Sequence, residues 1–285
     1  MKTEMACIPC IMKQAYNTAR RATENEKDIR KILNKTAEYL KKLKFDTTPA
    51  DASNYVYQIT GKITGNDDPF KNEKKKYNEI CKNMLPNLQK IIDQSEEKIY
   101  TSAKIAIFGN LIDLGIGLHF DLDKDLDKIL KKPFAWDDYK ELKRVLESGR
   151  KNILYLGDNA GEILFDSLLV DQLKDDHTVV FVVKSGPIIN DATMEDAKFA
   201  GLVEKIKVIE TGSDGIGVKW SSVSEEFQKE YGKADIILSK GQGNFETMWG
   251  KKGTIFFMLR AKCDSVAREI GVKFGDIVIR MQKNL

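Results

Sequence analysis

From Asn152 onward the chain alternates short apolar runs with longer amphipathic stretches, and this pattern constrains its fold more than any other feature. The apolar runs cover residues 153–156, 178–183, 206–209, 236–238, 254–258 and 277–279. Strands that alternate with helices are typical of a mostly parallel sheet covered by helices on both faces. The sequence therefore predicts an α/β domain over residues 149–285.

Residues 1–148 have a different pattern, in which apolar positions recur at three- and four-residue spacing. Such spacing predicts helices, which we expect near 3–22, 27–44, 47–64, 98–118, 121–131 and 136–148, with another helix starting after Asp68-Pro69. Pro86 interrupts the apolar stripe of that helix and is expected to kink or split it. The sequence thus predicts a helical part over 1–148, joined to the α/β domain by the short loop 148–152.

Composition excludes several classes of protein. Lys and Arg number 46 against 43 Asp and Glu, and the resulting charge of +3 is spread along the chain, unlike the basic face of a nucleic-acid-binding protein. No apolar stretch approaches the roughly 18 residues that a membrane span requires. The start of the chain lacks a secretory signal, and the four cysteines cannot form a disulfide framework. We expect a cytoplasmic protein with reduced thiols that binds neither nucleic acid nor membrane; a homo-oligomer stays an open alternative.

The first predicted strand ends in Gly157-Asp158-Asn159-Ala160-Gly161-Glu162. Ligands of open α/β sheets bind at the carboxyl ends of the strands, and the N–H groups at a helix start attract anions. Asp158 and Asn159 supply the hard oxygen donors that Mg²⁺ and Mn²⁺ prefer. This turn is therefore a candidate site for a metal ion and a phosphate.

The second predicted strand ends in a similar way, with Lys184 followed by Asn190-Asp191. If the two strands are neighbours, Asp191 lies close to Asp158, and two carboxylates that converge repel each other unless a cation intervenes. The alternative for Asp191 is an N-cap of the helix that follows. Both interpretations stay open at this point, and they are compatible.

A third turn, Lys240-Gly241-Gln242-Gly243-Asn244-Phe245-Glu246, follows another apolar run. Glycine permits close approach of the backbone to a ligand, and lysine is a compact charge for a phosphate oxygen. The spacing is not that of a P-loop, and an ordinary glycine turn is the alternative. Lys262, after the run that begins at Thr254, is a weaker candidate for the same edge.

Two features of the helical half stay ambiguous. Asn110 and Asp113 share one helix face and turn either toward the ion site or toward a hydrogen bond within the bundle. Cys7 and Cys10 form a C-x-x-C pair on a helix-prone segment, whereas a redox motif needs a preceding strand and a zinc site needs four ligands. A structural role is favoured for this pair over metal or redox chemistry.

As a set, these motifs resemble the metal-dependent damage-control phosphatases, in particular their microbial and archaeal branch with an N-terminal C-x-x-C. The resemblance covers essentially the whole chain and rests on Cys7-x-x-Cys10, Gly109-Asn110-x-Ile-Asp113, Gly157-Asp158-Asn159-Ala-Gly161-Glu162, Lys184 with Asn190-Asp191, Lys240-Gly-Gln-Gly-Asn244-x-Glu246 and Ala261-Lys262-Cys263. It implies a helical N-terminal part and a Rossmann-like three-layer α/β/α domain. It also implies hydrolysis of phosphate monoesters of small metabolites, such as sugar phosphates or damaged phosphopantetheine-like compounds.

The resemblance also assigns roles to residues. Asp158, Asn159 and Asp191 would hold a divalent ion (Mg, Mn, Co or Ni), and Lys240 would hold the phosphate. The substrate-binding group would comprise Asn110, Asp113, Glu162, Lys184, Asn244 and Glu246. Whether Asp158 attacks phosphorus or water attacks instead stays open. The alternatives are an S-adenosylmethionine-dependent protein carboxyl methyltransferase, an activity described for one branch of the family, and a non-catalytic metal- or metabolite-binding protein.

Overall fold

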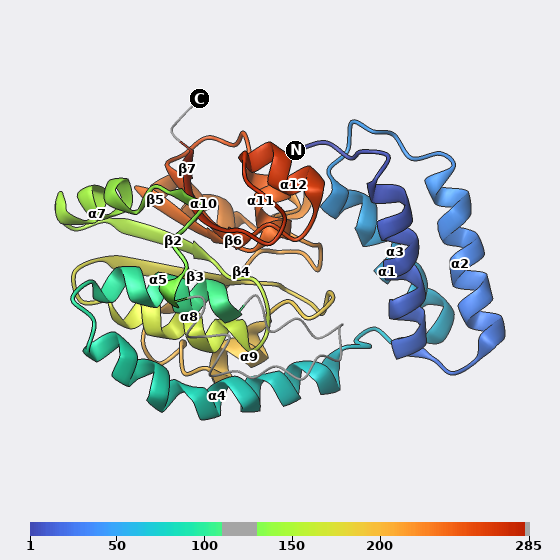
Figure 1. The fold of residues 1–285 in the computed structure, drawn as a ribbon. Helices are drawn as coiled ribbons and strands as arrows, with labels where there is room; N and C mark the ends of the chain where they lie inside the picture. The colour runs from blue at the N-terminus through green and yellow to red at the C-terminus, as the bar shows by residue number, and fades with distance from the viewer. Residues whose placement is uncertain (110–129, 283–285) are drawn as a thin grey trace.

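The computed structural model describes residues 1–109 and 130–282 of the chain. Figure 1 shows two parts, a helical bundle formed by the N-terminal segment and a larger layered part built around a sheet. This is the α/β architecture that the sequence predicts.

The N-terminal bundle contains α1 (Cys7–Ala22), α2 (Glu26–Leu40) and α3 (Pro49–Thr64). Ile11, Ile32 and Val56, one from each helix, are buried together in its core. The hydroxyl of Thr48 caps α3 by accepting a hydrogen bond from the N–H of Asp51 at 3.0 Å, which satisfies a donor at the helix start that has no partner within the helix. All three predicted helices are thus present.

The described strands form one seven-stranded sheet in the order β1-β7-β6-β5-β2-β3-β4. They are β1 (Trp136–Asp137), β2 (Asn152–Leu156), β3 (Thr178–Val183), β4 (Lys207–Glu210), β5 (Ile236–Lys240), β6 (Ile255–Arg260) and β7 (Ile277–Gln282). Neighbouring strands are parallel except β6 and β7, which are antiparallel. The predicted mostly parallel sheet is confirmed.

Helices cover both faces of this sheet (Figure 1). One face carries α5 (Lys98–Gly109), α8 (Glu162–Asp171), α9 (Met194–Phe199) and, outside them, α4 (Lys71–Asp93); the other carries α10 (Glu225–Lys233), α11 (Gln242–Met248) and α12 (Asp264–Ile270). Because successive side chains of a strand point to opposite faces, Tyr155 of β2 joins the first core and Leu154 joins the second. The two apolar cores fix the three layers.

Two local predictions are wrong in detail. The helix expected near 136–148 begins only at α7 (Tyr139–Glu147), because Trp136 and Asp137 pair with β7 at the edge of the sheet. Of the two outcomes expected at Pro86, the split does not occur, since α4 runs unbroken from Lys71 to Asp93, and the kink stays a prediction. Cys81 before the proline and Leu88 and Ile92 beyond it are buried in the first core, so packing holds both sides of Pro86 in one helix. The domain boundary at residue 148 stays a prediction.

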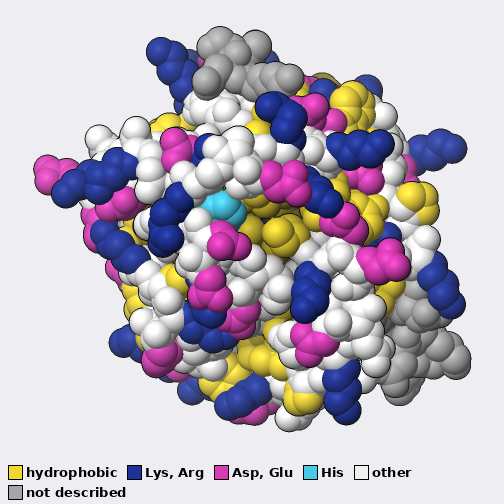
Figure 2. All heavy atoms as spheres, turned by 90° about the vertical axis from the view of Figure 1, so that its left-hand side faces the viewer, with side chains coloured by type: hydrophobic (Ala, Val, Ile, Leu, Met, Phe, Trp, Pro, Cys, Tyr) yellow, Lys and Arg dark blue, Asp and Glu magenta, His cyan; other side chains and the backbone are white. Residues whose placement is uncertain are grey.

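The surface agrees with the even spread of charge along the chain. On the side where α7 lies, Figure 2 shows basic and acidic side chains interspersed rather than gathered by sign. No helix within residues 1–109 and 130–282 is both long and apolar enough to span a membrane.

Candidate active site

The predicted motifs meet where the chain changes direction within the sheet. After β2 the chain moves outward to β3 and β4, and it then returns to place β5 on the opposite side of β2. Such a reversal opens a crevice at the carboxyl ends of the two central strands. Asp158 follows β2 and Gly241 follows β5, so both lie at this reversal point.

The loops after β2 and β3 are joined by their main chains. The N–H of Ala160 donates to the carbonyl of Asn190, and the N–H of Ala192 donates to the carbonyl of Asp158, both at 2.8 Å. These bonds make Asn159 and Asp191 an isolated antiparallel bridge. The structure thus brings together the three predicted ion ligands.

Asp191 does not cap the helix that follows it. The N-cap of α9 is Thr193, which forms a capping box with Asp196, so the capping alternative for Asp191 is wrong. The Asp191 side chain is instead buried beside Lys184, whose Nζ lies 3.6 Å from its Oδ2. Burial raises the pKa of Asp191 to about 6, although Lys184 opposes the rise.

Gly241 lies against the carboxyl group of Asp158. A Cβ atom at position 241 would lie 2.0 Å from Asp158 Oδ2 and 2.1 Å from Cγ. Gly241 also has a φ of 79°, in the region that only glycine adopts without a steric penalty. The glycine predicted to permit a close approach therefore does so, and the group that approaches is the side chain of Asp158.

Asn159 links the carboxyl groups of its neighbours. Its Nδ2 donates to Asp158 Oδ2 at 2.9 Å and to Glu162 Oε2 at 3.0 Å. Enclosure by protein raises the pKa of Asp158 well above its usual range, and the negative charges of Glu162 and Asp191 add to the rise. A nearby cation would favour the ionised form of carboxyl groups in such a place.

Lys240 is fully buried beneath this cluster. Its Nζ donates to Glu162 Oε1 at 2.5 Å, to Asp166 Oδ1 at 2.7 Å and to the carbonyl of Ala106 at 2.9 Å. An ammonium group has three donors, and protein oxygens take all of them in this structure. Direct phosphate binding by Lys240 stays a prediction, because a phosphate oxygen would have to replace one of these partners.

The charges of the site fit a divalent cation. Four carboxyl groups gather here, those of Asp158, Glu162, Asp166 and Asp191, whereas the buried ammonium groups beside them are those of Lys184 and Lys240. The four acids thus exceed these two lysines by two formal charges, and the nearby buried Lys74 is paired with a further acid, Asp68. Oxygen donors from two carboxylates and one amide are the kind that Mg²⁺ and Mn²⁺ prefer, so the residues present fit such an ion.

The other predicted substrate-binding residues lie in different places. Asn244 is buried and donates to the carbonyls of Gly157 and Lys240, at 2.9 and 2.8 Å, which ties the start of α11 to the end of β2. Glu246 accepts from Gln242 Nε2 at 3.0 Å, and burial raises its pKa to about 7. Substrate binding by both residues stays a prediction.

Asn110 and Asp113 lie outside the described residues. The last described residue before them, Gly109, packs against Glu162, where an added Cβ would meet Cγ at 2.9 Å. Cys7 and Cys10 lie in the first turn of α1, with Cys7 half-buried and Cys10 exposed. Burial raises the pKa of the Cys7 thiol, and a structural role for the pair stays a prediction.

Two polar residues of the site were not singled out from the sequence. Asp166 lies in the middle of the apolar helix α8 and is fully buried, and Asn78 lies on the buried side of α4. Asn78 Oδ1 accepts from the N–H of Gly161 at 2.6 Å and so holds the turn after β2. For Asp166 the available signal was a polar residue among apolar ones, because a buried polar group needs a partner. Asn78 stands in a mostly polar stretch of α4, which gives no such signal.

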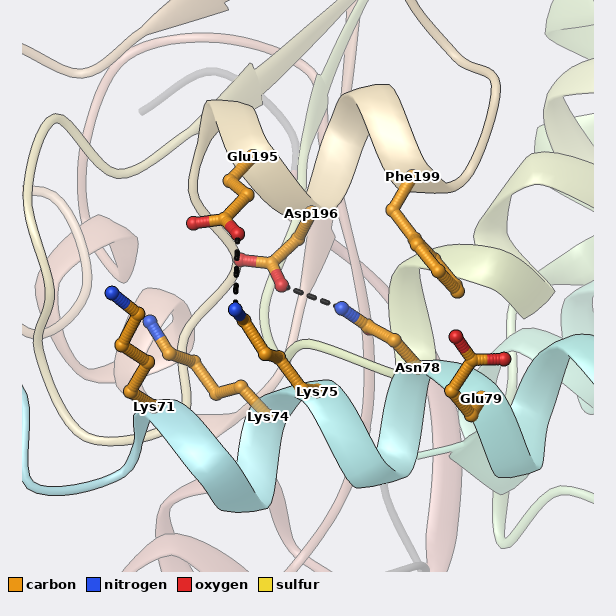
Figure 3. Close-up of a pocket in the computed structure, with 8 residues that line it drawn as sticks. All are labelled: Lys71, Lys74, Lys75, Asn78, Glu79, Glu195, Asp196 and Phe199. Atoms are coloured by element: carbon orange, nitrogen blue, oxygen red, sulfur yellow. Dashed lines mark hydrogen bonds and ion pairs between the residues drawn. The ribbon is translucent and has the colours of Figure 1, made fainter.

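A hollow of about 290 Å³ opens next to this turn, between α4 and α9. In Figure 3 the side chains of Lys71, Lys74 and Lys75 rise from α4 toward Glu195 and Asp196 of α9. Lys74 is buried and paired with Asp68 at 2.9 Å, and Lys75 lies 3.9 Å from Glu195. Phe199 completes the lining. The hollow shares Asn78 with the site, because Nδ2 of Asn78 donates to Asp196 at 2.7 Å.

A layered α/β fold with buried carboxyl groups where its central strands end defines a class of α/β proteins whose site lies at this edge of the sheet, and comparison with known proteins identifies the family. Residues 3–278 match the family described as the damage-control phosphatase ARMT1-like domain. The chain therefore belongs to this family, and the resemblance inferred from its motifs is confirmed.

Similar proteins include the damage-control phosphatase PH1575 of Pyrococcus horikoshii, which is 38% identical over 99% of both chains. A damage-control phosphatase of Archaeoglobus fulgidus is 31% identical over 99% of both. The crystal structure of the Pyrococcus horikoshii protein, described as a DUF89 family protein, superposes with a TM-score of 0.91 and covers 99% of this chain and 100% of that one. These relatives support a phosphatase role for the chain.

Proposed function

We propose that this protein is a divalent-cation-dependent phosphatase that hydrolyses phosphate monoesters of small metabolites, with sugar phosphates and phosphopantetheine-like compounds as the substrates to test first. The observation that carries the proposal is the meeting of Asp158, Asn159 and Asp191 on two loops joined by their main chains. The family to which the chain belongs supports the same reaction class.

The three residues would hold the ion through the carboxylates of Asp158 and Asp191 and the Oδ1 atom of Asn159. A bound divalent ion neutralises phosphoryl oxygens and stabilises the charge that develops during transfer. Mg²⁺, Mn²⁺, Co²⁺ and Ni²⁺ are the candidates. The buried lysines hold the carboxyl groups in place, since Lys184 contacts Asp191 and Lys240 contacts Glu162.

A positively charged side chain at the edge of the site is suited to bind the substrate phosphate. Lys262 follows β6 at the same edge of the sheet and is partly exposed. Its backbone N–H donates to Gln242 Oε1 at 3.0 Å, which fixes it beside the turn after β5. Its charge opposes the rise in the pKa of Asp158, so Lys262 lies close enough to act on an anion bound there. The hollow lined by Lys71, Lys74 and Phe199 shares Asn78 with the site and is our candidate space for the rest of a small anionic substrate.

The test is hydrolysis of p-nitrophenyl phosphate, followed by a panel of phosphorylated metabolites, with each of the four ions in turn. We expect activity that a chelator abolishes and added ion restores. Asp158→Asn and Asp191→Asn should lose at least a hundredfold in kcat/KM. Asp171→Asn, at the far end of α8 where Asp171 pairs with Lys205 at 2.6 Å, is the matched control and should retain full activity.

Two results would reject the proposal: no turnover with any of the ions, or full turnover in Asp158→Asn. Calorimetric uptake of S-adenosylmethionine in the absence of added ion would instead support the methyltransferase alternative.

A further inference from the structure

A chain of buried polar side chains runs from the interior of the sheet to the amide of Asn159. The hydroxyl of Tyr155 donates to Asp166 Oδ1 at 2.7 Å. Lys240 Nζ donates to the same oxygen at 2.7 Å and to Glu162 Oε1 at 2.5 Å. The other carboxyl oxygen of Glu162 accepts from Asn159 Nδ2 at 3.0 Å.

Glu162 links Lys240 to Asn159, because each of its two carboxyl oxygens accepts a hydrogen bond from one of these side chains. The position of Lys240 therefore affects that of the Asn159 amide. Both N–H groups of the Asn159 amide are then used, one on Glu162 and one on Asp158. Reversing the amide would place its oxygen against two carboxylates. The network therefore fixes Oδ1 as the atom that Asn159 presents to a cation.

Asp166 and Tyr155 set the position of Lys240 in turn. Both are completely buried, and Asp166 Oδ2 has no hydrogen-bond partner within the described residues. Buried ion pairs add little net stability, because apolar residues of similar volume often do as well or better. Stability alone therefore does not explain this cluster of two carboxylates and one ammonium group. Positioning of Glu162 explains it better.

We propose that Asp166 and Tyr155 are positioning residues of the ion site, acting through Lys240 and Glu162 on the orientation of the Asn159 amide. This inference rests on the proposed function, because it assigns to both residues a role in holding the divalent ion. Neither residue contacts substrate in this role.

The cleanest test is Tyr155→Phe, which removes one donor and leaves the charge of the site unchanged. The ring should keep its stacking on Phe181, whose centroid lies 4.8 Å away. The matched control is Tyr139→Phe on α7, which lies away from the site. Tyr139 is also buried, and its hydroxyl donates to Glu97 Oε2 at 3.1 Å. Mn²⁺ affinity is measured by calorimetry on the full chain, with the thermal unfolding of the ion-free protein alongside.

We expect Tyr155→Phe to bind Mn²⁺ at least threefold more weakly than the wild type and to recover kcat at saturating Mn²⁺, while the control binds as the wild type does. Asp166→Asn, which unlike Tyr155→Phe removes a charge, should weaken Mn²⁺ binding at least tenfold. If Asp166→Asn does not fold, Tyr155→Phe alone decides. Affinities of Tyr155→Phe and its control that agree within experimental error would overturn the inference.

The outcomes separate this inference from the proposed function. Wild-type protein that binds Mn²⁺ but hydrolyses no phosphate ester rejects the proposed reaction, and the affinity ratio still decides the positioning role. Wild-type protein that hydrolyses esters while Tyr155→Phe binds Mn²⁺ normally rejects the positioning role alone. Wild-type protein that binds no Mn²⁺ rejects this inference.

Discussion

Replacing Gly241 by alanine tests the geometry of the site most directly. The new Cβ would lie 2.0 Å from Asp158 Oδ2, whereas ordinary van der Waals contact begins at 3.4 Å. The carboxyl group would have to move by about 1.4 Å, and a displacement of roughly 1 Å at a reacting centre can cost about a hundredfold in rate. With φ 79° and ψ 165°, Gly241 also lies in a backbone region that is essentially restricted to glycine, so a residue with a Cβ adds strain of about 1–3 kcal/mol.

The matched control is Gly271→Ala. Gly271 ends α12 with a φ of 87°, and the nearest atom to an added Cβ there is a ring carbon of Trp136 at 3.7 Å. The control thus shares a positive φ without a clash at the site, although its ψ of 35° places it in the left-handed helical region, which strains a residue with a Cβ less than the backbone of Gly241 does. We expect both variants to unfold a few degrees below the wild type, since a loss of 1 kcal/mol lowers Tm by roughly 2–4 °C in chains of 150–250 residues.

Activity should separate the two variants. We expect Gly241→Ala to lose about a hundredfold in kcat/KM on p-nitrophenyl phosphate at saturating ion and Gly271→Ala to retain at least half of the wild-type value. Equal activities in the two variants, at similar Tm, would refute the reasoning that Gly241 makes room for the Asp158 carboxylate.

Three other predictions follow from buried groups. In Lys184→Met the pKa of Asp191 should rise above about 6, because Lys184 lowers it; the loss of Mn²⁺ affinity on acidification should then begin at higher pH, as measured by calorimetry between pH 5 and 8. Burial raises the pKa of Glu246 from 4.5 to about 7, so the stability contributed by its protonated form is complete below pH 4.5 and is lost as pH rises through 7. Glu246→Gln should therefore gain up to about 3 kcal/mol relative to the wild type between pH 5 and pH 8 in urea unfolding. Asn244→Ala should lower the free energy of unfolding by about 2–4 kcal/mol, because it leaves the carbonyls of Gly157 and Lys240 unpaired.

Each of these predictions has a result that contradicts it. An unchanged acid limb in Lys184→Met, with Lys205→Met as the surface control, would show that Lys184 does not tune Asp191. Parallel pH profiles of Glu246→Gln and the wild type would mean that Glu246 ionises normally. Asn244→Ala that unfolds as the wild type does would show that both carbonyls find other partners.

The fold could be predicted well because its two halves differ in hydrophobic periodicity. Continuous apolar runs mark buried parallel strands, and the helical spacing of residues 3–64 marks the N-terminal bundle. The short strand β1 could not be predicted in this way, since its pairing with β7 depends on tertiary contact rather than on two residues of local sequence. The uninterrupted helix at Pro86 also depends on packing.

The candidate site could be predicted in part, for a related reason. Asp158, Asn159 and Asp191 follow strands directly, and parallel strands bring their carboxyl ends together. Local sequence does not show which partner a buried charge chooses, so the bonding of Lys240 to Asp166 and Glu162 was missed. Asp166 lies on a helix, one turn beyond the motif, and only the packing of α8 against β5 reveals its role.

The hydrogen bonds that join Ala160 to Asn190 and Ala192 to Asp158 involve backbone atoms alone. Because these bonds use no side-chain atoms, we expect side-chain substitutions in either loop to leave the spacing of the two loops intact. Mg²⁺ accepts oxygen ligands at about 2.0–2.1 Å and Ca²⁺ at about 2.3–2.6 Å, and a rigid cavity favours one ionic radius. We expect selectivity against Ca²⁺ to depend on these two backbone hydrogen bonds, and to persist when the side chains around them are substituted.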